Sequence, residues 1–189
     1  MKKTMVFGLM VMVLSGCVTP IGPIQNPIQT DQLLPEKHYI QGIKPQLQWT
    51  AECAPVAIKM VLDYYGVNIS IKEISSSVKQ TMIGTRMDEI EPFLTRIGLQ
   101  IKHHQDTDFK KPWIKYYISN NQPVLISGGH YLGMGGVGHM VVAIGYDDTK
   151  KYFYIVDPGQ KSVLTYTYHQ IQEWHTERGH SSVIAILKK

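Results

Sequence analysis

The order of hydrophobic patterns along the chain is the feature that most constrains its fold. Between residues 53 and 119 apolar side chains recur at helical spacing, whereas after Asn121 the sequence changes to short runs of β-branched and aromatic residues. We therefore predict an α+β fold, in which an N-terminal helical half packs against a C-terminal antiparallel β-sheet. No internal repeat is visible.

Four helices are predicted in the first half, each with a recognisable start or stop signal. In the first, the apolar positions run from Ala57 to Tyr65 and end at Gly66, and Pro55 suits its first turn. Ser70 followed by Glu73 predicts a capping box for the second helix. The second, third and fourth helices are expected at 70–78, at 85–98 with a cap formed by Thr85 and Asp88, and at 110–119.

The second half predicts a sheet of short strands. The clearest runs are 122–127, 139–146 and 151–156, with a hairpin turn at 147–150. The runs 163–166 and 182–187 are candidates for further strands, and a short helix is expected around 170–174.

The first sixteen residues are laid out as a secretory signal. Lys2 and Lys3 precede the apolar run 5–14, which is too short to span a bilayer. The ending Leu-Ser-Gly-Cys17 resembles a bacterial lipoprotein signal, which implies that residues 1–16 are removed and that Cys17 is acylated. With Val18 next to it, the resemblance favours the outer membrane of a Gram-negative cell envelope. The alternative is an ordinary signal peptide or a short anchor.

Residues 17–38 are predicted to be a tether and residues 39–189 one folded domain. Four prolines and the absence of any periodicity mark the tether. Without Lys2 and Lys3, the 19 basic residues of the chain become 17, against 15 acidic ones, so nucleic acid is not an expected partner. The composition, 43% hydrophobic and 18% charged, is that of a globular protein and not a disordered one.

Cys53 is the only thiol that remains once Cys17 is set aside, so no intramolecular disulfide is expected. It lies where a loop is predicted to enter a helix, and the positive end of the helix dipole favours an anion there. His139 begins one predicted strand and Asp157 follows the next, so a hairpin would bring them together. A thiol nucleophile needs an imidazole to take its proton and a third group to orient that imidazole.

Each of these residues also has a simpler interpretation. Cys53 would be a small buried apolar residue, His139 an ordinary histidine at a strand end, and Asp157-Pro-Gly a common turn sequence. The other histidines show no pair at the spacing of a zinc helix and Cys-x-x-Cys is absent, so neither a metal nor another cofactor is expected.

Six segments together resemble the papain-like cysteine peptidases of family 39, which include the bacteriocin leader peptidases, and more closely their stand-alone relatives. They are Gln48, Cys53, Asp-Tyr-Tyr-Gly at 63–66, Asn-Gln-Pro-Val at 121–124, the strand Gly-His-Met-Val-Val-Ala-Ile-Gly-Tyr-Asp at 138–147, and Val-Asp-Pro-Gly at 156–159. The resemblance runs from about Ile40 to the C-terminus. It implies a papain-like fold with Cys53 as nucleophile, His139 as general base and then acid, and Asp157 as the residue that orients the ring.

Two positions depart from the family pattern. Ala54 stands where the family usually has glycine after the cysteine, and Leu47 stands six residues before Cys53, where the oxyanion-hole glutamine is common. Gln48 and, as the alternative, Gln46 are the candidates to supply the side-chain amide. The hole would combine that amide with the backbone N–H of Cys53.

The sequence therefore predicts a membrane-anchored cysteine peptidase of the bacterial cell envelope, acting on a peptide or protein substrate. Two alternatives stay open: the same triad acting on another envelope amide, and a catalytically idle papain-like lipoprotein that binds a partner. Trp49 and Trp174 are either substrate contacts or core residues. The glycine-rich segment 128–138 is interpreted as a mobile lid beside His139. Substrate specificity and oligomeric state do not follow from the sequence.

Overall fold

The computed structural model describes residues 34–49, 51–79, 81, 84–105, 109, 111–129, 138–177 and 182–188. Within these ranges, no helix combines the length and the apolar character needed to cross a membrane. The predicted signal peptide, Cys17, most of the predicted tether and most of the predicted lid at 128–138 lie outside the described residues.

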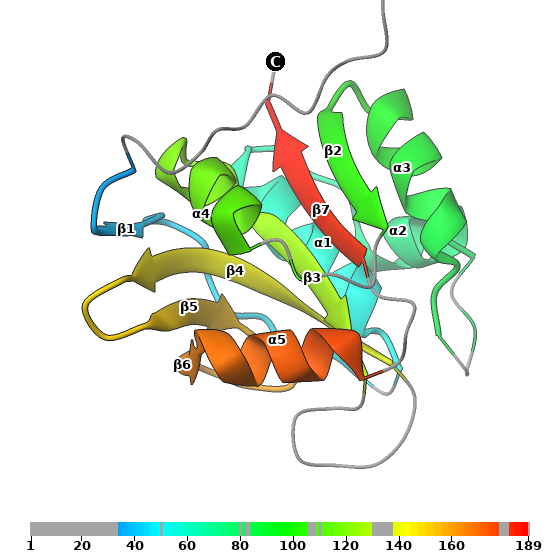
Figure 1. Cartoon of the computed structure of the whole chain (residues 1–189). Helices are drawn as coiled ribbons and strands as arrows, with labels where there is room; N and C mark the ends of the chain where they lie inside the picture. Colours follow the sequence, from blue (N-terminus) through cyan, green and yellow to red (C-terminus); the bar gives the residue numbers. More distant parts are fainter. Residues whose placement is uncertain are drawn as a thin grey trace, which may run out of the picture.

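The described residues form an antiparallel sheet of seven strands (Figure 1). The strands are β1 (Lys37–Tyr39), β2 (Gln100–Gln105), β3 (Val124–Gly128), β4 (His139–Asp147), β5 (Tyr152–Val156), β6 (Val163–Thr167) and β7 (Ser182–Leu187). Their order is β2-β7-β3-β4-β5-β6, and β1 pairs with β4. On one edge of β4, residues 139–143 pair with β3, and residues 145–147 pair with β1.

Five helices lie around this sheet in the described part of the chain. They are α1 (Cys53–Tyr64), α2 (Ile71–Ser77), α3 (Met87–Arg96), α4 (Lys111–Ser119) and α5 (Tyr168–Thr176). The capping prediction for α2 is confirmed, because the Ser70 side chain accepts a hydrogen bond from the Glu73 backbone N–H. The predicted cap of α3 is wrong: its N-cap residue is Arg86, whose guanidinium pairs with Asp88, and Thr85 lies outside the helix.

The hydrophobic core lies between the helices and the central strand β4. Figure 1 shows α1 behind the sheet and α4 in front of it, and both helices contact β4. All nine residues of β4 are consequently buried, including the polar ends His139 and Asp147. A strand covered on both faces positions its side chains firmly, because they are packed in a dense core.

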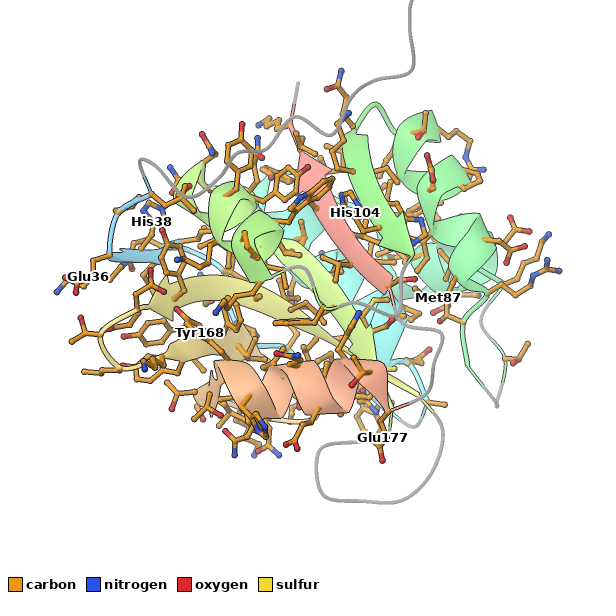
Figure 2. The ribbon with its side chains drawn as sticks, in the orientation of Figure 1. Glu36, His38, Met87, His104, Tyr168 and Glu177 are labelled. Atoms are coloured by element: carbon orange, nitrogen blue, oxygen red, sulfur yellow. The ribbon has the colours of Figure 1, made fainter. Side chains whose placement is uncertain are left out.

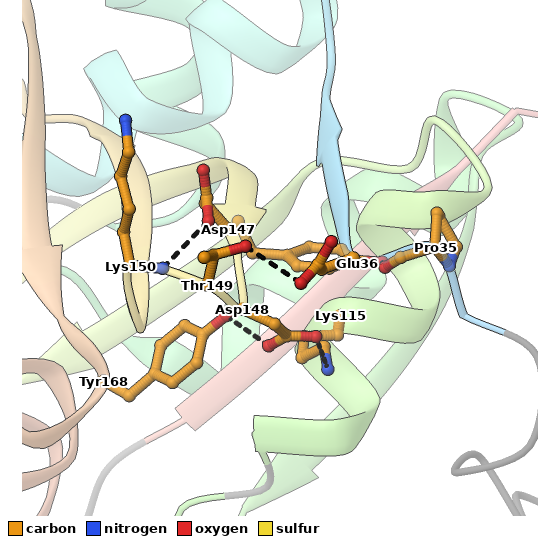
Figure 3. Close-up of polar contacts among 9 residues, drawn as sticks. Pro35, Glu36, Lys115, Asp147, Asp148, Thr149, Lys150 and Tyr168 are labelled. Atoms are coloured by element: carbon orange, nitrogen blue, oxygen red, sulfur yellow. Dashed lines mark hydrogen bonds and ion pairs between the residues drawn. The ribbon is translucent and has the colours of Figure 1, made fainter.

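The end of β4 at Asp147 holds the N-terminal segment of the described chain. The Tyr146 hydroxyl donates to the Pro35 carbonyl at 2.8 Å, and the Asp148 backbone N–H donates to the Glu36 carbonyl at 2.8 Å. Figure 3 shows how Thr149 also reaches Glu36 from the β4–β5 turn, through a hydrogen bond of 2.9 Å. Residues 35 and 36 are therefore bonded to the Asp147 end of β4, while the domain boundary at residue 39 stays a prediction.

Lys115 and Tyr168 fix the β4–β5 turn from the other side. Lys115 forms an ion pair with Asp148 at 2.5 Å, and the Tyr168 hydroxyl donates to the same carboxylate at 2.7 Å (Figure 3). We call the contacts of residues 35–39 with β4 and its turn the N-terminal strap. The strap lies at the opposite end of β4 from His139.

Candidate active site

Cys53 is the first residue of α1, as the sequence predicts. Its thiol is half-buried and lies 3.9 Å from the carbonyl oxygen of Gly138, toward which it donates. Glu52 occupies the N-cap position, but its side chain makes no capping hydrogen bond. The first turn of α1 thus presents its backbone N–H groups at the position of the thiol, an arrangement that favours negative charge.

His139 and Asp157 come together as the hairpin prediction requires. His139 begins β4, Asp157 follows β5, and Nε2 of His139 lies 2.7 Å from Oδ1 of Asp157. Both side chains are almost wholly buried. The same Asp157 oxygen accepts the Gly159 backbone N–H at 2.7 Å, so the turn Asp157-Pro158-Gly159 holds the carboxylate in place.

The Cys53 side chain is the other titratable partner of the His139 ring. Because Nε2 faces Asp157, the nitrogen turned toward the thiol is Nδ1. Burial by itself lowers the pKa of His139, but the hydrogen bonds to Asp157 and Cys53, together with their negative charges, outweigh burial and raise this pKa to about 9. The imidazole is therefore held in its protonated form at neutral pH.

The two candidate glutamines occupy different surroundings. The Gln48 backbone N–H donates to the Pro158 carbonyl at 2.8 Å, which ties the loop before Cys53 to the Asp157 turn, and Oε1 of Gln48 is buried. The Gln46 amide instead donates to Asp63 at 2.7 Å, near the C-terminal end of α1. Cys53 lies at the other end of that helix, so the geometry favours Gln48 as the residue near the thiol.

Trp174 and Gly128 pack against each other beside His139, a contact that the sequence did not predict. The Trp174 ring is buried and lies edge-on to the His139 ring, with 6.5 Å between the centroids. A Cβ atom at Gly128 would lie 2.4 Å from the Trp174 ring, so only glycine allows this contact. Close packing of glycine against an aromatic ring leaves no periodic signal in a sequence.

The next residue, Gly129, also packs closely against the C-terminal end of α5. Its backbone N–H donates to the Trp174 carbonyl at 2.9 Å, and a Cβ atom there would lie 2.2 Å from the Glu177 carboxylate. Figure 2 labels Glu177 just past α5, well away from Glu36 in the strap. Trp49, in contrast to Trp174, is 82% exposed.

The remaining histidines of the described chain serve other contacts. His103 lies 3.1 Å from the Ser182 hydroxyl, and His175 is buried with Nδ1 2.9 Å from the Ser127 carbonyl oxygen. His104 packs edge-on against Trp113. Among the residues that the structure describes, no three His, Cys, Asp or Glu side chains are grouped so that they could hold a metal ion.

Residues 40–182 match the family model described as the Peptidase_C39 like family. This match spans most of the chain, and the protein therefore belongs to that family. The chain is a cysteine peptidase of the C39-like type, as the sequence resemblance predicts. No curated protein sequence matches the chain significantly.

Solved structures of similar fold include a protein from Bacillus anthracis described as a C39-like peptidase, with 15% identity, a TM-score of 0.64, and coverage of 82% of this chain and 99% of that one. The peptidase domain of Streptococcus ComA, a bifunctional ABC transporter of a quorum-sensing pathway, is 19% identical with a TM-score of 0.60. The match covers 78% of this chain and 100% of that domain. A double-glycine-motif protease from an AMS/PCAT transporter, solved with the leader peptide, has 17% identity, a TM-score of 0.57, and coverage of 81% and 99%. The predicted papain-like α+β fold is thus confirmed.

Proposed function

We propose that Cys53, His139 and Asp157 form a catalytic triad that hydrolyses peptide bonds through a thioester intermediate. The observation that carries this proposal is the His139 imidazole, whose Nε2 lies 2.7 Å from the buried Asp157 carboxylate and whose pKa is also raised by its interaction with Cys53. A buried carboxylate beside the ring fixes its tautomer and orientation, so that the other nitrogen exchanges its proton with the nucleophile.

In the first half of the reaction, the Cys53 thiolate attacks the carbonyl carbon of the substrate. The carbonyl oxygen becomes negative in the tetrahedral intermediate, where the Cys53 backbone N–H and the Gln48 amide donate to it. His139 then gives its proton to the amide nitrogen, the C–N bond breaks and the amine leaves. The acyl group remains on sulfur as a thioester.

In the second half, His139 acts as a base and takes a proton from water. The resulting hydroxide attacks the thioester carbonyl carbon, a second oxyanion forms in the same hole, and the C–S bond breaks. The carboxylic acid product leaves, and the Cys53–His139 pair is regenerated. Asp157 keeps its hydrogen bond to Nε2 in both halves and orients the ring throughout.

An extended segment of a peptide or protein is the proposed substrate. The support comes from the family and from the similar protease structure solved with a leader peptide. Cleavage after a double glycine is not part of the proposal, because it belongs to those transporter-linked proteins. The same triad acting on another envelope amide, or an idle triad in a binding protein, are outcomes of the tests below.

We extend the proposal to a lipid anchor on Cys17 that holds the domain at a bacterial membrane, the outer one in a Gram-negative cell. The support is the resemblance of residues 14–17 to a lipoprotein signal. The chain enters the domain at the Asp147 end of β4, whereas the thiol lies near the His139 end. Nine strand residues span about 27 Å, so the site and the attachment point would lie at opposite ends of the domain.

The test of the triad is alkylation of Cys53 as a function of pH, in a form that lacks residues 1–18 so that a single thiol reports. We expect rapid alkylation at pH 6, where an ordinary thiol is almost wholly protonated, and loss of that reactivity in His139→Ala. A rate that follows an ordinary thiol in both proteins would leave the idle, partner-binding alternative as the better account.

The test of the anchor is metabolic labelling with an alkyne fatty acid in a bacterial host. We expect the full chain to be labelled and Cys17→Ser to remain unlabelled, while Cys53→Ser keeps its label. Labelling of Cys17→Ser, or none of the full chain, would exclude acylation at Cys17. Fractionation of the envelope then tests the outer-membrane assignment.

A further inference from the structure

A pocket of about 500 Å³ lies between the loop that leads to Cys53 and helix α2. It is lined by Trp49, Glu52, Ile71, Lys72, Ser75 and Ser76. Glu52 directly precedes Cys53, so this pocket is next to the proposed nucleophile. Its volume lies in the range of sites that bind small ligands or single side chains.

Trp49 supplies an open aromatic face at this pocket. It is 82% exposed, and Leu47, two residues earlier, is 44% exposed. These two residues flank Gln48, and in the described part of the chain Tyr116 is the other large hydrophobic residue that is exposed. Apolar side chains gathered beside a reactive site indicate a surface that is covered when a substrate binds.

Glu52 supplies a carboxylate whose surroundings leave it available to a ligand. It is half-buried at the N-cap of α1, yet it does not cap the helix. The Ser75 hydroxyl lies 3.4 Å from Oε1, a long hydrogen bond. Among the described residues, no Lys, Arg or His lies within ion-pair distance of Glu52.

We propose that this pocket is a specificity subsite that binds a basic side chain, Arg or Lys, of the peptide substrate. The cation would stack on Trp49 and pair with the Glu52 carboxylate. Tryptophan is the best aromatic partner for a cation, and a half-buried carboxylate is screened less by solvent than an exposed charge. This inference rests on the proposed peptidase function and adds a substrate class to it.

Lys72 is the charge that opposes this assignment, and its position limits its effect. It is exposed in the first turn of α2, so its ammonium group is solvated and can move away from the pocket. An acidic substrate side chain would have to use Lys72 and would meet Glu52. Because Glu52 directly precedes Cys53, the positions to vary in a substrate are those on either side of the scissile bond.

The experiment is kinetic profiling of peptides that differ at one position near the scissile bond, with Arg, Lys, norleucine, Gln or Glu there. The quantity compared is the ratio of kcat/KM for the Arg peptide to kcat/KM for the norleucine peptide. It is measured for the wild-type protein and for Glu52→Gln, Trp49→Ala and Lys72→Gln. Glu173→Gln is the matched control, because it removes one carboxylate from the exposed face of α5. Circular dichroism verifies that every variant is folded.

We expect the wild-type ratio to favour Arg and the control to match it. Glu52→Gln should lower the ratio by about fivefold and Trp49→Ala by about threefold, the sizes of a partly exposed ion pair and a cation–π contact. Lys72→Gln should raise the ratio by about twofold. Turnover of the norleucine peptide should persist in all of them.

Three results would overturn the proposal. The first is an Arg preference that Glu52→Gln and Trp49→Ala leave unchanged. The second is the absence of a basic preference at any position while the norleucine peptide is cleaved. The third is a preference for Glu that Lys72→Gln abolishes, which would assign the pocket to an anion. If wild-type protein cleaves none of the peptides and Cys53 alkylation is independent of His139, the peptidase proposal itself fails, and the subsite fails with it.

Discussion

The two ends of strand β4 differ in the kind of polar contacts that they make. At the His139 end, an imidazole and a carboxylate are buried and face each other with few other polar partners. At the Asp147 end, the turn and the strap share several polar contacts that lie partly in solvent. Burial makes each interaction at the first end strong and consequential, whereas at the second end no single contact dominates.

Both ends also capture a segment from the N-terminal part of the chain. The Gln48 backbone is bonded to Pro158 at the His139 end, and residues 37–39 pair with β4 at the strap. We therefore expect the strap to contribute mainly to stability, and the His139 end to carry the proposed chemistry. Substitutions at the two ends should therefore separate activity from stability.

The largest expected effect is loss of catalysis at the His139 end. We expect Cys53→Ala to abolish peptide cleavage and His139→Ala to lower kcat/KM by about 10³-fold or more, because the proposed mechanism uses the Cys53 sulfur as nucleophile and His139 to transfer each proton. Thermal unfolding should be little changed in Cys53→Ala. Cleavage that survives in Cys53→Ala would mean that the nucleophile lies elsewhere.

Next in size is the effect of Asp157→Asn on both rate and pH dependence. In the wild type, His139 with its pKa of about 9 stays protonated up to that pH, so kcat/KM should fall as the pH rises past about 9. The hydrogen bond and the charge of Asp157 raise the pKa of His139, so the loss of that charge in Asp157→Asn lowers it. The fall should therefore move to lower pH, and kcat/KM should drop by about 10²-fold. A pH profile identical to the wild type would show that Asp157 does not tune His139.

A pair of glycine substitutions compares the two ends directly. A Cβ atom at Gly128 would lie 2.4 Å from Trp174, and one at Gly145 would lie 2.8 Å from the His38 carbonyl. We expect Gly128→Ala and Gly145→Ala each to lower the free energy of unfolding by about 1–3 kcal/mol. At a temperature where both are folded, Gly128→Ala alone should lower kcat/KM, by about tenfold. Equal kinetics in the two variants would contradict a separation of roles.

The smallest expected effect is that of Tyr146→Phe in the strap. The hydroxyl is lost from Pro35, and the free energy of unfolding should fall by about 1–2 kcal/mol while kcat/KM changes less than twofold. Urea unfolding and peptide cleavage measure the two quantities. The control lies away from the strap: Tyr65→Phe removes a buried hydrogen bond of 2.6 Å to Ile186 in β7. It should lower the free energy of unfolding by a similar amount. A kinetic defect in Tyr146→Phe would show that the strap influences the site.

Periodicity predicted most of the elements, and the misses have identifiable causes. Helices α1 to α5 and strands β3 to β7 lie close to their predicted positions. β2 was missed because its sequence, Gln-Ile-Lys-His-His-Gln, is polar, as suits the edge position that it occupies among the described strands. β1 was missed because three residues after a proline carry no periodic signal.

The choice between Gln46 and Gln48 shows where local reasoning ends. Both lie near the expected spacing from Cys53, and no residue between them distinguishes the two. The structure separates them by contacts with distant residues, Asp63 for Gln46 and Pro158 for Gln48. Such contacts depend on how the elements pack.

Periodicity, caps and motifs are properties of neighbouring residues, so they were enough to predict the helical and sheet halves, the family, and Cys53, His139 and Asp157 as candidate site residues. Folding had to be known before we could see which nitrogen of His139 faces Asp157, which glycines pack against Trp174, and that Trp49 and Glu52 meet α2 in a pocket. These features join residues far apart in the chain, and packing of the core around β4 sets their positions.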